Sequence, residues 1–148
     1  MVRSREAAAL GTLHAGAPFV SMVPYAVLAD SSAFAIHVSR LASHTRDMLA
    51  DARVSLLVMQ GEGEGVEAQA LARLSVQGEA RALAKGSAEE ARGREAYLAR
   101  FPEAEPLTSF GDFSFFEIRP AQARFVAGFA QAMSVTGESL CRILAAAR

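Results

Sequence analysis

The sequence has few of the residues that build metal sites and disulfide frameworks. It contains one cysteine, Cys141, three histidines and no tryptophan. A single cysteine excludes an internal disulfide and any zinc site made of several thiolates. Three histidines do not favour a histidine-rich metal site. We therefore expect no bound metal.

Long apolar runs and an excess of positive charge are also absent. No segment approaches the roughly 18 consecutive apolar residues of a membrane-spanning helix. The charged residues 1–6 are not followed by the apolar core of a signal peptide. The formal net charge is −1, whereas domains that bind nucleic acids are usually clearly basic. We therefore expect a cytoplasmic protein whose partners are neither nucleic acids nor membranes.

The composition that is present predicts a folded core. The chain has 148 residues, of which 51% are hydrophobic and 21% charged, which is typical of one globular domain. We expect residues 1–148 to form a single domain whose residues 136–148 end it as a helix.

Hydrophobic periodicity predicts a mainly β protein. Alternation is clearest over residues 74–82, where one face is apolar and the other polar. Helices are expected at 43–50, at 88–100 after the capping pair Ser87 and Glu90, and at 136–147. Residues 61–70 are expected to form an exposed loop, and Pro120 to break or bulge its strand. The remaining strands are expected at 7–14, 19–28, 34–38, 54–59, 113–118 and 123–132, with turn spacing that favours an antiparallel barrel or sandwich.

The segment richest in chemistry lies where a strand is expected to give way to a helix, at residues 39–46. It holds Ser39, Ser43, His44, Thr45 and Arg46. The first amides of a helix are unpaired and carry partial positive charge, so with hydroxyl and guanidinium donors they can bind a phosphate. The alternative is that Ser43 only caps the helix while Arg46 is solvated.

Three other segments are weaker candidates. Pro24 lies in the apolar strand segment Ser21-Met22-Val23-Pro24. It could release backbone N–H and C=O groups of the strand to contact a flat heteroaromatic ring. The alternative is that it only marks an edge strand. Arg73 opens the alternating strand and could reach an anion or face solvent. Gly128 lies in an apolar strand segment. It could mark a close approach of another backbone or ligand, or it could be a small residue chosen for packing. His37 could line a pocket, but a structural histidine is the preferred interpretation.

These segments, in this order, resemble a known family. They are similar to segments of the pyridoxamine 5'-phosphate oxidase-like proteins with the FMN-binding split barrel. The segments that carry the resemblance are Ser21 to Tyr25, Ile36 to Ser39, Ser43 to Val54, Ser75 to Arg81 and Ala123 to Phe129. The resemblance covers roughly residues 7–135 and is closest to the haem-utilisation branch. It implies a six-stranded antiparallel Greek-key barrel with helices, which forms a homodimer and binds FMN between the subunits.

The resemblance also implies which residues contact the cofactor. Ser21, Met22, Val23 and Pro24 would run along the flavin ring, and Val38 with Ser39 would lie near the ribityl phosphate. The phosphate itself would be held by Ser43, His44, Thr45 and Arg46. Arg73, Gly128 and Phe129 would complete the site. No histidine follows His44, so the oxidase's C-terminal Arg/His pair has no counterpart, and vitamin B6 oxidation is not expected.

Three functions remain open on the sequence alone. The first is an FMN-dependent oxidoreductase of unknown substrate. The second is a non-catalytic flavin or haem binding protein linked to haem iron utilisation. The third is a barrel without cofactor that serves as a dimeric interaction module. Because imidazole loses its charge near neutral pH, we expect FMN to bind more weakly above about pH 7.

Overall fold

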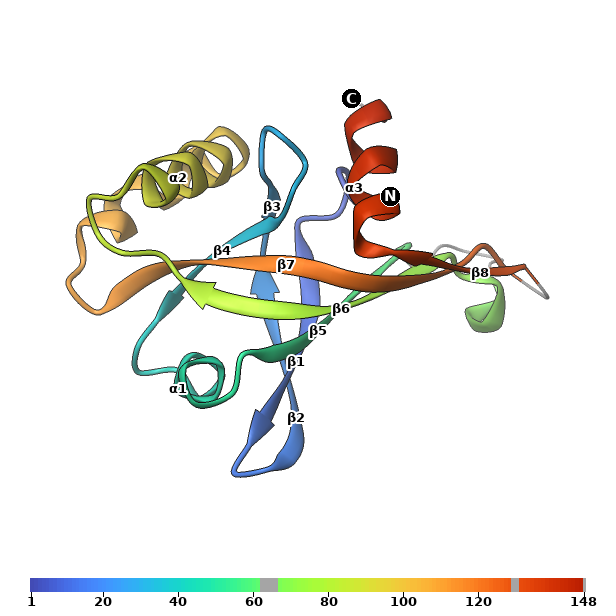
Figure 1. Ribbon diagram of the computed structural model, residues 1–148, viewed down its shortest axis with the longest axis horizontal. Coiled ribbons are helices and arrows are strands. Elements are labelled where there is room, and N and C mark those ends of the chain that lie inside the picture. Colours follow the sequence, from blue (N-terminus) through green and yellow to red (C-terminus); the bar gives the residue numbers. More distant parts are fainter. Residues whose placement is uncertain (62–66, 129–130, 148) are drawn as a thin grey trace.

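An antiparallel sheet curls into a half-barrel in the computed structural model, which describes residues 1–61, 67–128 and 131–147 (Figure 1). Within these ranges the sheet has eight strands in the order β2-β1-β5-β6-β7-β4-β3, with β8 beside β7. The mainly β split barrel expected from the sequence is confirmed, with more strands than the six expected. The strands are β1 (Ala7–His14), β2 (Ala17–Pro24), β3 (Ala26–Val27), β4 (Phe34–Ser39), β5 (Arg53–Met59), β6 (Arg73–Ala82), β7 (Phe113–Val126) and β8 (Ala132–Thr136).

Pro24 is the point where the chain changes partner. The sequence predicts one strand over residues 19–28, but β2 ends at Pro24 and the chain resumes as β3. β2 pairs with β1, whereas β3 pairs with β4 at the other end of the sheet. A residue without an amide proton suits a break in the ladder. The interrupted segment thus links the two ends of the curled sheet.

The core lies inside the curl and follows the predicted alternation. In β6 the side of Leu74, Val76 and Ala80 is buried, while the intervening residues are exposed. The same core cluster contains large side chains from four other strands: Leu10, Ile36, Leu56, Phe116 and Ile118. Each buried side chain of this size contributes roughly 1.5–3 kcal/mol by leaving water.

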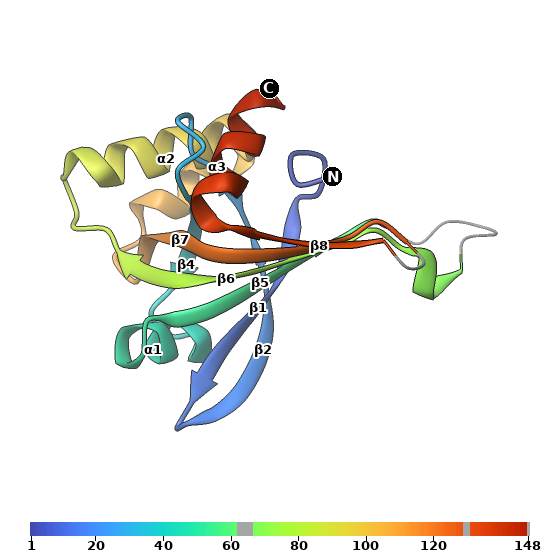
Figure 2. The same cartoon turned by 45° about the vertical axis from the view of Figure 1, so that its right-hand side comes forward.

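Helices cover the sheet on two sides (Figures 1 and 2). Helix α1 (Ser43–Ala50) lies below it in these views, while α2 (Ala88–Arg100) and α3 (Gly137–Ala146) lie above it. The Ser87 hydroxyl accepts a hydrogen bond from the Glu90 amide at 3.1 Å, which confirms the predicted cap. Two short 3-10 turns occupy Ala68–Ala70 and Pro102–Ser109. No helix in the described part of the chain is long and apolar enough to cross a membrane.

The region around Pro120 differs from the prediction. The two strands expected at 113–118 and 123–132 are one strand, β7, and β8 follows it. The break was wrong but the bulge is present, because the register with β6 shifts between Gln77 and Gly78. At this bulge the backbone approaches closely: a Cβ on Gly78 would lie 2.1 Å from the Arg119 carbonyl oxygen.

The expected loop over residues 61–70 is only partly described. Residues 67–70 are exposed, as predicted. Residues 62–66 lie outside the described ranges. Gly128 is not inside a strand: it lies after β7 with a φ of +108°, a conformation that favours glycine. The expectation that this glycine lies inside a strand was therefore wrong; a Cβ on it would lie 3.4 Å from the Ala70 carbonyl oxygen.

Candidate functional site

The predicted strand-to-helix corner is formed by the end of β4 and the start of α1. Helix α1 begins at Ser43, and its N-cap is Ala42, which has no side-chain oxygen to cap the helix. The alternative that Ser43 is the cap was therefore wrong. The first amides of α1 have no capping side chain, so they keep their capacity to donate to an oxyanion.

Four polar side chains surround this helix end. The Oγ of Ser21, on β2, and the Nδ1 of His44 share a hydrogen bond of 3.0 Å. The Arg46 guanidinium donates to the Ser43 hydroxyl at 3.5 Å and is exposed. We call Ser21, Ser43, His44 and Arg46 the α1 site. It joins β2 to α1 across 23 residues of sequence.

The other predicted residues of this corner build it from inside. Thr45 is 0% exposed, and its hydroxyl donates to the Ser39 carbonyl at 2.7 Å. The Ser39 hydroxyl donates to Asp112 at 2.8 Å and accepts from the Leu41 amide at 3.1 Å. Val38 is buried in the core. These side chains fix the turn, while Ser43, His44 and Arg46 face outward more.

A second polar cluster on α1 was missed by the sequence analysis. Asp47 is only 5% exposed, and its carboxylate accepts from the Thr12 hydroxyl at 2.9 Å. Its other oxygen lies 2.8 Å from the Nδ1 of His14, whose side chain is 55% exposed. Because 33 to 35 residues separate the partners, no local pattern indicates the cluster. It fastens α1 to β1.

The charge state of this corner follows from burial. Burial lowers the pKa of His44, and the negative charge of Asp47 opposes that effect. Burial alone would raise the pKa of Asp47, but hydrogen bonds from His14 and Thr12 and the nearby positive charges lower it overall. Asp47 is therefore ionised and His44 largely neutral at pH 7.

The β2 residues expected beside a flavin alternate between core and surface. Val23 is 1% exposed and belongs to the core, so only its backbone can meet a ligand. Met22 is 64% exposed, and Pro24 is exposed as well.

Two further predicted residues, Arg73 and Gly128, do not join this cluster in one chain. Arg73 opens β6 and pairs with Val126 at the end of β7, and Gly128 follows that strand. This end of the sheet lies on the opposite side of the molecule from α1 (Figures 1 and 2). Phe129 lies outside the described residues.

His37 is a core aromatic, as preferred from the sequence. Its ring stacks on Phe115 with centroids 4.2 Å apart and contacts Phe113 and Tyr97. Burial, and then the positive charge of Arg94, lowers its pKa. The described residues hold no group of three or more side chains able to bind a metal.

Two hollows stand out, and neither is lined by Ser43, His44 or Arg46. One, of about 610 Å³, lies between α2 and β3. The other, of about 550 Å³, lies on the outer face of the sheet and is lined by residues of β1, β2, β5, β6 and β7.

Comparison with known proteins now bears on this arrangement. Residues 1–127 match the pyridoxamine 5'-phosphate oxidase family. The chain belongs to this family. The matched range contains the whole α1 site and the strands that position it.

Its similar relatives carry haem-related names. The chain is 39% identical over 123 residues to the chloroplastic non-canonical heme oxygenase HOZ of Arabidopsis thaliana, covering 83% of this chain and 36% of that protein. It is 29% identical over 140 residues to heme oxygenase HutZ of Vibrio cholerae, covering 93% and 78%. A heme binding protein from Mycobacterium smegmatis has a TM-score of 0.86 and 30% identity, with 95% and 57% covered.

These coverages set the scope of the likeness. The chain spans about a third of the Arabidopsis protein and just over half of the Mycobacterium structure. The membership of the haem-utilisation branch expected from the sequence is confirmed, and the split-barrel fold is shared.

Proposed function

We propose that this protein is a haem-binding member of its family, linked to haem iron use, and that the α1 site holds the oxyanion of the cofactor. The observation that carries the proposal is the start of α1, where uncapped amides meet Ser43, His44 and Arg46. Haem propionate and FMN phosphate share this chemistry. The names of the relatives favour haem.

The residues of the site fit such a group. Amide, hydroxyl, imidazole and guanidinium donors converge without a carboxylate of their own, since Asp47 is held by Thr12 and His14. Haem when bound supplies iron, and FMN a redox-active ring. His14 is the histidine we expect to ligate iron, because an imidazole fixed by a carboxylate and partly exposed is a common metal ligand.

An FMN-dependent oxidoreductase is the second candidate. It is favoured by the hydrogen bond between Ser21 of β2 and His44 at the start of α1. We expect β2 to contact the flavin ring and the start of α1 to bind the phosphate, so one FMN molecule could contact both. In this case Ser21 to Pro24 would lie along the ring. We assign no general acid or base, because no described group is placed against a reacting atom.

We further propose that the cofactor lies between two copies of this chain. Val20 and Met22 expose apolar side chains on one face of β2, at 67% and 64%. Val20 also lines the hollow on the outer face of the sheet. A second copy would cover this face, and it alone could bring Arg73 and Gly128 to the α1 site, since one chain keeps them apart.

Absorbance titration at several pH values tests the proposal. We expect the protein to give a shifted Soret band with haem, and His14→Ala to change that band while His37→Ala leaves it in place. Affinity for FMN or haem should change little between pH 7.5 and 6.5 and rise as the pH falls further, because burial lowers the pKa of His44 below its ordinary value of about 6.5. The burial of His44 thus moves the expected change to lower pH than the sequence alone implies.

His44→Gln provides the control for the pH effect, because any titration of the ligand itself affects this variant and the unchanged protein equally. If affinity rose by the same amount in His44→Gln, His44 would not be part of the cofactor site. Absence of uptake of both haem and FMN would leave the interaction module as the surviving interpretation.

A further inference from the structure

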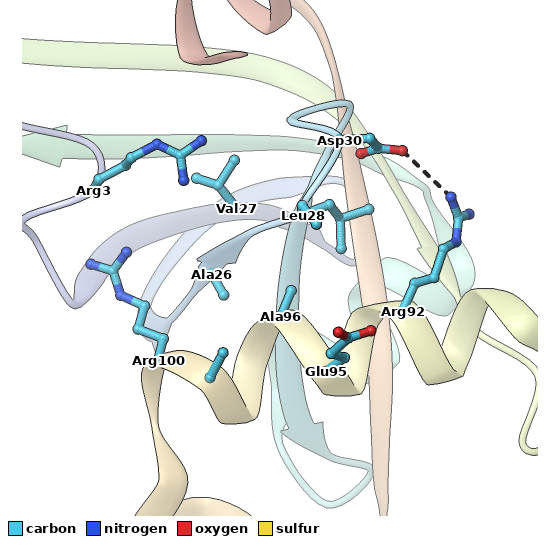
Figure 3. Close-up of a pocket in the computed structure, with 11 residues that line it drawn as sticks. Arg3, Ala26, Val27, Leu28, Asp30, Arg92, Glu95, Ala96 and Arg100 are labelled. Carbon is cyan, nitrogen blue, oxygen red and sulfur yellow. Dashed lines mark hydrogen bonds and ion pairs between the residues drawn. The ribbon is translucent and has the colours of Figure 1, made fainter. Parts of the chain in front are cut away.

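A second concave site lies on the other side of the sheet from α1. The hollow of about 610 Å³ is enclosed by β3, by one face of α2 and by the N-terminal segment (Figure 3). This volume is within the range of small-molecule sites, roughly 300–1,000 Å³. Its floor is apolar and consists of Ala26, Val27 and Leu28 with Ala96 of α2.

One face of α2 forms a charged wall of the hollow. The helix contributes five residues at intervals that place them on this face: Arg92, Glu95, Ala96, Ala99 and Arg100. The other rim is supplied by Arg3 and by Asp30, which follows β3.

The charges are unevenly distributed over this rim. Figure 3 shows the Arg3 and Arg100 side chains together at one end, and the Arg92–Asp30 ion pair, 3.4 Å long, with Glu95 toward the other. Arg3 donates to the Ser31 hydroxyl and the Leu144 carbonyl, each at 3.1 Å. These acceptors are neutral, so they leave its positive charge uncompensated.

Arg100 is similarly uncompensated. Its guanidinium donates to the Arg5 carbonyl and lies 5.2 Å from the centre of the Tyr25 ring. Its Nε is buried without a hydrogen-bond partner in the described part of the chain. Neither Arg3 nor Arg100 has a carboxylate partner among the described residues. Burial raises the pKa of Tyr25 to about 12, although Arg100 and Arg5 act to lower it, which indicates positive potential at this end.

We propose that this hollow binds a small organic oxyanion with an apolar body about the size of one aromatic ring. Its charged group lies between Arg3 and Arg100, and its apolar part covers Val27 and Ala96. Two guanidinium groups match a doubly charged phosphate better than a carboxylate. Glu95 opposes the anion from the far end. The site is separate from the α1 site, since α2 and α1 lie on different sides of the sheet.

Calorimetric titration with phenyl phosphate tests the proposal, carried out in the His44→Ala/Arg46→Ala protein so that the α1 site does not contribute. Benzoate and inorganic phosphate serve as comparison probes. We expect phenyl phosphate to bind more tightly than either. Arg3→Gln should weaken it about tenfold, as expected for one charge-assisted contact, and Glu95→Gln should tighten it a few-fold.

Opposite signs for two rim substitutions distinguish a binding site from a structural role. Arg100→Gln should also weaken binding, and its packing on Tyr25 makes Arg3→Gln and Glu95→Gln the decisive variants. Arg142→Gln, on α3 and paired with Glu138 at 2.9 Å, should change nothing. Unaltered affinity in both Arg3→Gln and Glu95→Gln, or no phenyl phosphate binding, would overturn the proposal. Haem or FMN uptake by the Glu95→Gln protein reports separately on the α1 site.

Discussion

Replacing His44 and Arg46 together by alanine is expected to weaken haem or FMN binding by at least about 100-fold. Each side chain supplies a charged or polar donor beside the first amides of α1. A hydrogen bond to a charged group contributes about 1.5–3 kcal/mol, and every 1.4 kcal/mol is tenfold in affinity. Equilibrium titration followed by absorbance measures the effect.

The same double substitution should leave the fold intact. Arg46 is exposed and His44 is half-buried, and neither belongs to the core cluster. Arg94→Ala, on α2 at the other side of the sheet, is the matched control for loss of one positive charge and should change affinity less than threefold. Equal losses in Arg94→Ala and the double variant would mean that only overall charge, and not the α1 site, attracts the cofactor.

Gly78→Ala is expected to destabilise the protein by at least about 3 kcal/mol, since overpacking against rigid backbone is among the costlier substitutions. The new Cβ would lie 2.1 Å from the Arg119 carbonyl oxygen and 3.2 Å from the Cα of Pro120. Backbone of a central strand cannot move aside as a flexible side chain does. Urea unfolding followed by circular dichroism measures the loss.

Gly11→Ala is the matched control, because Gly11 also lies inside a strand. A Cβ there would meet Ser55 at 3.6 Å, an ordinary van der Waals contact. It should therefore change stability by less than about 1 kcal/mol, as most substitutions without a clash do. Similar losses in the two variants would show that removing strand glycine flexibility, and not the close approach at the bulge, sets the cost.

Local patterns predict the local parts of this fold well. The helix expected at 43–50 has those bounds, and the cap at Ser87 is present. The strands around Pro120 were predicted less well, because the residue can end a strand or sit at a bulge. Pairing with β6 decides between these outcomes, because the register between β6 and β7 shifts opposite Pro120. The sequence of one strand alone does not show how it pairs with its partner.

The candidate site follows the same division. Residues 39–46 are contiguous, so their chemistry can be read along the chain. The cluster of Asp47, His14 and Thr12 depends on α1 packing on β1, and only the folded chain shows it. The outward position of Ser43 depends on where α1 starts, and that start lies one residue earlier than a Ser43 cap would require.

A crystal structure of the protein grown with haem, and a second with FMN, would test the central claim most directly. We expect a propionate or phosphate oxygen within hydrogen-bond distance of the Ser43–Thr45 amides and of Arg46. We also expect a second copy of the chain over the exposed apolar side of β2. A cofactor bound elsewhere while the α1 site holds only water would show that the start of α1 does not hold the cofactor.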